Sequence, residues 1–387
     1  MYIDMETTCE NGFPSIENPE EKIIAISCNY KGKTHVYCLG EFTRDDNNII
    51  INEYDDEQQL LRDFIKFMQE TQPEIITGWN VRFFDIPYLV NRCKKILDDK
   101  EVKELSPWGI IKESIVNSRG EDKLVYDLVG ISILDYYELY KTFTYVNQES
   151  YKLDHIAYVE LGEKKLSYSE YDNMSDFYKK NFQKFIEYNI KDVELVQRLE
   201  EKLRLIELAV ALAYSAGVNY NDVFSQVKTW DVIIYNYLKK HGIIIPPKKN
   251  NIKDEQYAGA YVKEPLVGMH NWVVSYDVNS LYPSLIIHFN ISPETLQHKN
   301  FKGKIDINDI LNKNKNSETF KCFEIAKEMK CSIAANGTLY SNDKRGFLPE
   351  LMDKMYKERK QFKDKMIESK KELEAINNEL KRRGLKV

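Results

Sequence analysis

Hydrophobic positions follow two periods over residues 1–206. Apolar or alternating runs predict strands, and apolar residues at helical spacing predict amphipathic helices. The predicted strands are residues 1–6, 21–30, 33–39 and 73–80. The predicted helices are residues 56–70, 85–97 and 175–212, and residues 124–140 begin as a strand and continue as a helix. Strands that alternate with helices indicate an α/β layer structure.

The pattern changes after a polar, proline-bearing linker at residues 246–251, which predicts a domain boundary. Beyond the linker, we expect strands at 257–263 and 272–277, and a helix at 281–289. A Lys/Asn-rich stretch at 300–316 is expected to be an exposed insertion, and residues 351–386 predict one long charged helix. The chain of 387 residues is long enough for two or three domains.

Composition narrows the class of protein. No apolar run is long enough to span a membrane, and the first residues lack the basic and apolar regions of a secretion signal. The six cysteines form no C-x-x-C pair, which argues against structural zinc and favours a reducing cytoplasm. The net charge of −6 does not indicate nucleic-acid binding, although local basic faces matter more than the total.

Carboxylates form the first candidate site. Asp4 and Glu6 are two residues apart in a predicted strand, so both side chains leave the same face, where they could share a divalent ion. Taken alone, this pair is explained more simply by a solvated strand face. Asp85 follows G-W-N-V-R-F-F and could be only a helix cap. Tyr188 and Asp192 are one helical turn apart, a spacing that a plain surface pair also shows.

The three motifs in this order resemble the DEDDy class of 3′–5′ exonucleases, which have an RNase H-like sheet. The resemblance implies that Asp4, Glu6, Asp85 and Asp192 bind two Mg²⁺ or Mn²⁺ ions, about 3.5–4 Å apart, and that Tyr188 orients the attacking water. Hard oxygen ligands without a Cys or His cluster suit Mg²⁺ rather than zinc. Asn80 and Phe84 are candidate contacts to single-stranded 3′ ends, with Phe84 stacking on bases.

A second motif, S-Y-D-V-N-S-L-Y-P-S, occupies residues 275–284. An aspartate that caps a helix would explain Asp277, but not the L-Y-P-S that follows. The segment resembles motif A of family B DNA polymerases. The resemblance implies that Asp277 binds the polymerase metals and that Tyr282 excludes ribonucleotides. The backbone amides expected to face the triphosphate belong to Val278, Asn279, Ser280 and Leu281.

Further matches support this family. Tyr257 and Gly259 lie in Y-A-G-A, which resembles the Y-x-G-G/A element that contacts the template strand. Arg359 and Lys363 are one turn apart in a segment that resembles the first fingers helix, where they would bind the triphosphate. A solvated charged helix explains this segment, taken alone, equally well. Residues 223–231 and 290–295 are similar to the T-even-type bacteriophage group of the family.

The resemblance therefore predicts four parts. These are an exonuclease domain at 1–206, a helical connector at 207–248 left from an N-terminal domain, a partial palm at 249–345 and the start of the fingers at 346–387. The family's N-terminal domain, its K-x-x-x-N-S-x-Y-G motif and its Y-x-D-T-D-S motif have no match. We therefore expect a truncated gene or a polymerase divided between two polypeptides.

Three functions remain open from the sequence. The first is the N-terminal part of a DNA polymerase, with DNA primer-template, dNTP, a second polymerase polypeptide and a sliding clamp as partners. The second is a free-standing 3′–5′ DNA exonuclease, and the third is a non-enzymatic DNA-binding remnant or subunit. A host-cell cytoplasm is the expected location, with no membrane contact.

Overall fold

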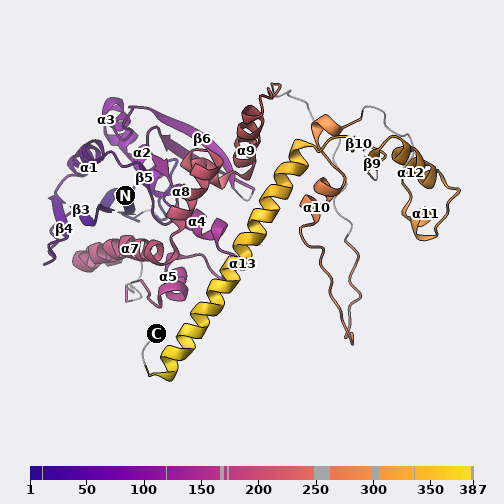
Figure 1. The fold of residues 1–387 in the computed structure, drawn as a ribbon. Coiled ribbons are helices and arrows are strands. Elements are labelled where there is room, and N and C mark those ends of the chain that lie inside the picture. Colours follow the sequence, from indigo (N-terminus) through magenta and orange to yellow (C-terminus); the bar gives the residue numbers. More distant parts are fainter. Residues whose placement is uncertain are drawn as a thin grey trace. The chain divides into compact units, whose positions relative to one another are not determined.

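The computed structural model describes residues 1–10, 12–118, 120–165, 170–171, 174–247, 262–297, 305–334 and 336–384. It divides into two compact units, Met1–Asp254 and Glu255–Val387 (Figure 1). The boundary agrees with the break expected near residues 246–251. Tyr257, Gly259 and most of the strand expected at 257–263 lie outside the described residues. The finer division into four parts stays a prediction.

The first unit is built on a mixed sheet. Its strands are β1 (Tyr2–Thr7), β2 (Ile23–Tyr30), β3 (Lys33–Leu39), β4 (Ile49–Tyr54), β5 (Ile75–Ile76) and β8 (Ser132–Ile133). The order is β1-β2-β3-β4, antiparallel except for the parallel β3–β4 pair. A parallel bridge between Tyr2 and Thr77 connects this sheet to the parallel β5–β8 pair. β6 (Ile111–Ser118) and β7 (Glu121–Leu128) form a separate antiparallel hairpin.

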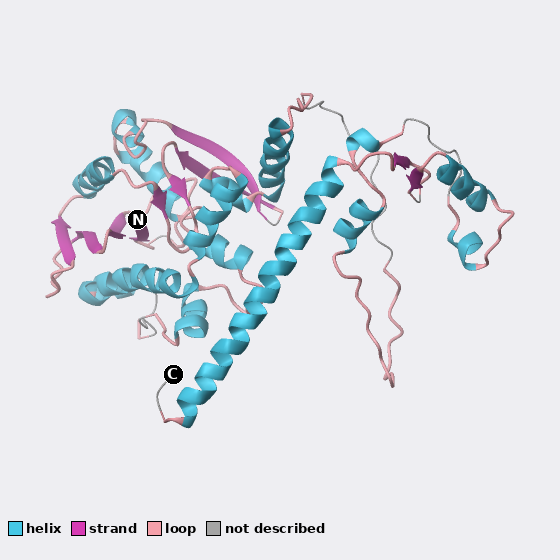
Figure 2. Cartoon of the chain, viewed as in Figure 1, coloured by secondary structure: helices cyan, strands magenta, loops and turns pink. Residues whose placement is uncertain are grey.

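Helices cover both faces of the sheet, which makes it the middle layer (Figure 2). The helices of the first unit are α1 (Glu57–Thr71), α2 (Asp85–Ile96), α3 (Asp99–Lys103), α4 (Tyr136–Phe143), α5 (Leu153–Leu161), α6 (Met174–Lys180), α7 (Phe182–Leu203), α8 (Leu205–Ala216), the short 3-10 helix η1 (Tyr220–Phe224) and α9 (Gln226–Lys240). Ile23 and Ile26 of β2 pack with α1 and α2, whereas Ile24 packs with α7. Because β2 is covered on both sides, its sequence is an almost continuous apolar run.

The long helix expected at 175–212 is wrong in one respect, because the structure divides it into α6, α7 and α8. The Asn181 side chain accepts a hydrogen bond from Lys184 N at 3.1 Å and begins α7. Arg204 has a positive φ of 53° and ends α7 before α8 starts. The helical periodicity continues across both breaks, so the sequence pattern alone does not reveal them.

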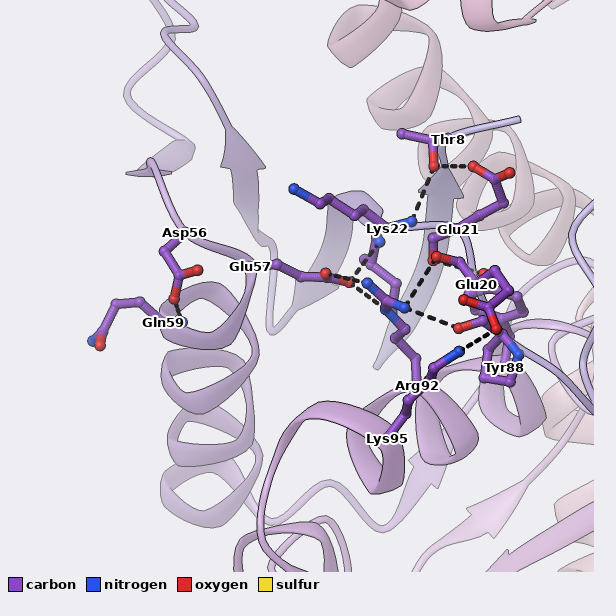
Figure 3. Close-up of polar contacts among 12 residues, drawn as sticks. Thr8, Glu20, Glu21, Lys22, Asp56, Glu57, Gln59, Tyr88, Arg92 and Lys95 are labelled. Atoms are coloured by element: carbon purple, nitrogen blue, oxygen red, sulfur yellow. Dashed lines mark hydrogen bonds and ion pairs between the residues drawn. The ribbon is translucent and has the colours of Figure 1, made fainter. Parts of the chain in front are cut away.

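A buried ion pair fixes α2 against α1. The Arg92 guanidinium donates to both oxygens of Glu57, at 2.8 and 2.6 Å, and to the carbonyls of Pro19 and Glu20 (Figure 3). Glu57 also accepts from Ile23 N at 2.8 Å, at the start of β2. Each guanidinium nitrogen of Arg92 and both carboxylate oxygens of Glu57 therefore have a hydrogen-bond partner, which is the condition under which a buried ion pair is tolerated. The pair holds the helix that begins at Asp85.

The second unit contains α10 (Leu281–His288), the 3-10 helix η2 (Pro293–Thr295), α11 (Ile307–Leu311), α12 (Glu318–Glu328), the β9 (Cys331–Ile333) and β10 (Leu339–Ser341) pair, and α13 (Phe347–Arg382). α10 packs against α13. Asn290 joins them, since its side chain donates to the carbonyls of Ser341 and Lys344 and accepts from Gly346 N, just before α13. The long charged helix expected at 351–386 is present as α13, which begins earlier, at Phe347, and ends at Arg382; residues 385–386 lie outside the described part of the chain.

The strand expected at 272–277 is wrong. The described residues of the second unit form no strand there, and the side chains of Trp272 and Tyr276 are 98% and 92% exposed. An isolated extended segment has no neighbour to accept its backbone hydrogen bonds, so apolar sequence alone does not make it a strand. The helix that follows is present as α10. Among the described residues, no helix is both long and apolar enough to cross a membrane.

Candidate active site

The first strand brings two carboxylates to one face. Asp4 and Glu6 alternate with Ile3 and Met5, which pack with α1 and α2, so both acids leave the opposite side of β1. Carboxylate oxygens of Asp4, Glu6 and Asp192 all lie within 4.8 Å of one another. This is the one group of its kind that the described residues contain.

Helix α7 supplies Asp192 because it packs across β1 and β2. Asp192 and Tyr188 lie one turn apart on its buried side, and Asn189 lies between them. Asn189 donates from Nδ2 to Asp4 Oδ2 at 2.7 Å, which fixes that carboxylate. Sequence patterns did not identify Asn189 as a site residue, although its position beside Tyr188 in Y-N-I-K-D could have indicated that role.

Asp85 reaches the same place from the first turn of α2. It is the first residue of the helix rather than its cap, and its Oδ1 accepts from Met5 N, between Asp4 and Glu6, at 3.1 Å. Simple capping, the alternative considered from the sequence, is therefore wrong. Gly78 brings this loop close to β1, because a Cβ there would lie 2.2 Å from the carbonyl oxygen of Ile3. All four predicted acids thus converge at the centre of β1.

Asp135 is a buried carboxylate that sequence patterns did not reveal as part of the site. It has no exposed surface and accepts from Asn80 N at 3.0 Å, Arg82 N at 2.9 Å and Tyr137 N at 2.9 Å. It caps α4 and at the same time holds the loop that leads to Asp85. Its position before a helix gave only a capping signal, since the contact with residues 80–82 is made across the fold.

Lys165 is the second residue that the sequence did not reveal. Its ammonium group forms an ion pair with Asp192 and donates to the Tyr188 hydroxyl at 3.2 Å. Lys165 lies in a polar connecting segment with no periodic pattern, so no signal marked it. Its Nζ places a positive charge against the carboxylate group.

The carboxylates carry raised pKa values because they are buried together. Burial first, and then the neighbouring Asp192, raises the pKa of Glu6 to about 8. Burial and Asp135 raise the pKa of Asp85 to about 7. Burial raises the pKa of Asp192 to about 6 against the opposing effect of Lys165, and burial with three neighbouring acids raises the pKa of Asp4. The Lys165 charge therefore offsets only part of the cost of burying these acids together.

Aromatic rings border the Asp85 side of the site. Phe84 has its ring centroid 5.6 Å from that of Phe13 and 5.7 Å from that of Tyr88. Phe13 is 87% exposed, so this aromatic surface is open to solvent. Asn80 begins the turn before Phe84 with a positive φ of 72°. Asn80 and Phe84, the two residues expected to contact single-stranded 3′ ends, thus lie on the loop that carries Asp85.

The second candidate site has a different character. Val278 and Tyr282 are 64% and 76% exposed, and Asp277 precedes a turn in which Ser280 has a positive φ of 52°. No second group of three metal-binding side chains forms around Asp277 within the described residues. Arg359 and Lys363 lie on the exposed surface of α13. The structure does not assemble these residues into a closed site.

Comparison with known proteins identifies the family. A family model described as DNA polymerase family B, exonuclease domain, matches residues 1–156, and one described as DNA polymerase family B matches residues 224–387. The chain is 36% identical over 343 residues to a DNA-directed DNA polymerase of Escherichia phage RB69, covering 88% of this chain and 36% of the relative. It is 34% identical over 330 residues to that of Enterobacteria phage T4, covering 85% and 35%.

More distant relatives include the DNA polymerase delta catalytic subunit of Candida albicans, which is 27% identical over 391 residues, 94% of this chain and 35% of the relative. The chain belongs to the family B DNA polymerases, with an exonuclease domain followed by part of the polymerase domain. It spans about a third of the length of the curated relatives that it matches.

Proposed function

We propose that this chain removes nucleotides from 3′ ends of DNA by two-metal phosphodiester hydrolysis. The observation that carries the proposal is the convergence of Asp4, Glu6 and Asp192 oxygens within 4.8 Å, with Asp85 fixed to the backbone between the first two. Three separate elements, β1, α2 and α7, supply these acids. A solvated strand face or an isolated surface pair would not require such convergence.

The donor set fits divalent cations. All four ligands are carboxylates, and the buried Oδ1 atom of Asp192 has no hydrogen-bond partner among the described residues, so it is available to a cation. Bound Mg²⁺ or Mn²⁺ would lower the pKa of a water molecule and stabilise the leaving 3′ oxygen. Asp4, Glu6, Asp85 and Asp192 would hold the ions, and the raised carboxylate pKa values agree with a buried site in which these acids outweigh the Lys165 ammonium.

The surrounding side chains have supporting roles in this proposal. Tyr188 orients the attacking water, and Lys165 holds the Tyr188 hydroxyl and the Asp192 carboxylate in register. Phe84 presents a ring for the terminal base, supported by Phe13 and Tyr88. Asn80 contacts the DNA strand next to the terminal base.

The direct test uses a 5′-labelled single-stranded oligonucleotide with the purified chain. We expect a ladder of products shortened from the 3′ end in Mg²⁺ or Mn²⁺, and no cleavage in EDTA. A 3′-phosphorothioate end should slow the first step. Absence of divalent-dependent shortening, or products that arise only from internal cleavage, would contradict the proposal.

A second proposed function is DNA polymerisation, with primer-template and dNTP as substrates. The match of residues 224–387 to the family and the motif around Asp277 favour it. A two-metal polymerase site needs more than one carboxylate, so Asp277 requires ligands from outside the described residues. Further sequence of the same protein or a second polypeptide could supply them; a sliding clamp is a further expected partner, and the phage relatives favour the host cytoplasm as the location.

This second proposal has its own experiment. The chain is mixed with a candidate polypeptide that carries K-x-x-x-N-S-x-Y-G and D-T-D motifs, and extension of a labelled primer is followed. We expect extension with both polypeptides and its loss on Asp277→Ala. Extension that survives Asp277→Ala would contradict the role of this aspartate.

A further inference from the structure

A cavity of about 330 Å³ lies beside the loop that carries Asp85 and belongs wholly to the first unit. Its walls come from the loop, from the start of β7 and from α4. The lining residues are Asn80, Phe83, Glu121, Lys123, Tyr137, Glu138, Lys141 and Thr142. None of the four candidate metal ligands lines it. The volume is at the small end of the range for small-molecule sites, which suits one nucleotide unit rather than a duplex.

The loop at 78–85 connects this cavity to the carboxylates. One side of the loop lies against β1, through Gly78 and the hydrogen bond from Met5 N to Asp85. The other side lies against α4, through the hydrogen bonds from Asn80 N and Arg82 N to Asp135. The cavity, which Asn80 and Phe83 of this loop line, is therefore joined to the contact between Asp85 and β1 by one short loop.

Charge in the cavity favours a phosphate. Glu138 is neutralised by Arg82 at 2.9 Å, and Glu121 lies 4.0 Å from Lys123. Lys141 has no ion pair with a carboxylate in the part of the chain that the structure describes. Its ammonium group instead lies over two rings, 5.8 Å from the centroid of Tyr137 and 5.4 Å from that of Tyr151. These contacts hold a cation at the cavity without cancelling its charge.

Aromatic side chains also line the cavity. Phe83 and Tyr137 form part of the wall, and the Lys123 ammonium lies 5.4 Å from the Phe83 centroid. Two lysines, aromatic walls and an amide side chain are the groups that bind single-stranded nucleic acid with little sequence preference. A small apolar ligand would leave the Lys141 ammonium without an anionic partner, so it fits the cavity less well than a phosphate does.

We propose that this cavity is the subsite for the nucleotide immediately 5′ of the one being released, with Lys141 bound to its phosphate. The inference rests on the proposed exonuclease activity and assigns the binding of the second nucleotide of the substrate to α4. Phe84 and the carboxylates hold the terminal nucleotide, whereas the cavity holds the next one. Recognition is then of a polynucleotide strand and not of a free mononucleotide.

The test compares two substrates on the full chain. The p-nitrophenyl ester of thymidine 5′-monophosphate fills only the terminal position, whereas oligothymidylates of increasing length also fill the cavity. For Lys141→Ala, we expect the ratio of kcat/KM on a trinucleotide to kcat/KM on the ester to fall about five- to tenfold, mainly through a higher KM. Lys141→Arg should restore most of the ratio, because it keeps the positive charge.

Salt dependence separates a phosphate contact from a structural effect. The slope of log kcat/KM on the trinucleotide against log salt concentration should become shallower by about 0.7 in Lys141→Ala, the value for one lost contact to a single strand. Lys66→Ala, an exposed lysine on α1 paired with Glu70 at 4.0 Å, is the matched control and should keep both the ratio and the slope.

Two results would overturn the subsite. One is an unchanged ratio and slope in Lys141→Ala, and the other is an equal loss on the ester and the trinucleotide. A wild-type chain that hydrolyses neither substrate in Mg²⁺ or Mn²⁺ would instead overturn the proposed exonuclease, and the subsite with it. Hydrolysis of the ester by the wild type therefore shows which of the two inferences has failed.

Discussion

The carboxylates of the first unit and the aspartate of the second differ in how the fold completes them. Asp4, Glu6, Asp85 and Asp192 come from three elements and meet around β1. Asp277 comes from the more distinctive sequence motif, yet it lies in an exposed segment without a neighbouring carboxylate group among the described residues. A clear motif supplies one ligand, whereas a metal site needs several elements packed in one place.

The two regions also differ in the contacts that fix their helices and strands relative to one another. Around the first site, buried polar groups such as Asp135, Asn189 and the Arg92–Glu57 pair fix the elements relative to one another. In the second unit, the fixed point is Asn290, which joins α10 to α13, while the segment before α10 stays exposed. Packing therefore makes the first site rigid, and substitutions in the two regions should differ in their effects.

The largest expected effect separates the two sites directly. Asp4→Ala combined with Glu6→Ala should lower the 3′–5′ hydrolysis rate by about a thousandfold or more, because the ions lose two of four ligands. Asp277→Ala should stay within about twofold of wild type. Rates on a labelled oligonucleotide provide the measurement, and equal losses in both variants would remove the distinction between the sites.

The next effect concerns stability. Arg92→Met should lower the free energy of unfolding by about 3–5 kcal/mol, because it leaves the buried Glu57 carboxylate without its partner. Lys357→Ala, which breaks the exposed pair with Asp353 at 2.8 Å on α13, should cost less than about 1 kcal/mol. Urea unfolding followed by circular dichroism compares them. Similar midpoints for the two variants would show that the buried pair does not stabilise the first unit.

A smaller effect is expected from the support behind Asp85. Asp135→Asn keeps the shape but replaces an acceptor with an NH₂ group that faces backbone N–H groups, so the loop at 80–82 must shift. Hydrolysis should fall about 10- to 100-fold, with a higher Mg²⁺ requirement, as for other changes behind a metal ligand. Asp127→Asn, an exposed aspartate on β7, is the control. An unchanged Mg²⁺ requirement would argue against the positioning role of Asp135.

The smallest effect is a pH dependence of stability in EDTA. The folded pKa values of Glu6, Asp85 and Asp192 are raised to about 8, 7 and 6, so the folded chain binds more protons than the unfolded chain between about pH 4 and pH 8. Stability from this group should therefore fall as pH rises through that window. The raised pKa of Lys165 lies above the window and does not alter the sign.

Thermal unfolding at pH 5.5 and pH 8 measures this effect. We expect Tm to be several degrees lower at pH 8 in EDTA, and Mg²⁺ to recover most of the difference because it binds only the folded site. Asp4→Ala with Glu6→Ala should flatten the dependence and abolish the Mg²⁺ effect. A Tm in EDTA that rises with pH in the wild type, but not in this variant, would contradict the expected direction.

Much of the first unit follows from local pattern. Strands β1, β2 and β3 and helices α1 and α2 agree with their predicted positions within a few residues, because each has one apolar face or run that must be buried. The shared face of Asp4 and Glu6 follows in the same way from strand alternation. The division of residues 175–212 did not follow, because Asn181 and Arg204 interrupt the backbone without interrupting the apolar pattern.

The sequence by itself determined which acids could bind metal, since their type, order and local spacing are properties of short segments. It also determined that residues 281–289 and 351–386 would be helical. Only the tertiary structure decided that Asp85 contacts β1, that Asp135 and Lys165 support the site, and that residues 272–277 are not a strand. Those features depend on contacts between residues far apart in the chain, for which short-range patterns carry no information.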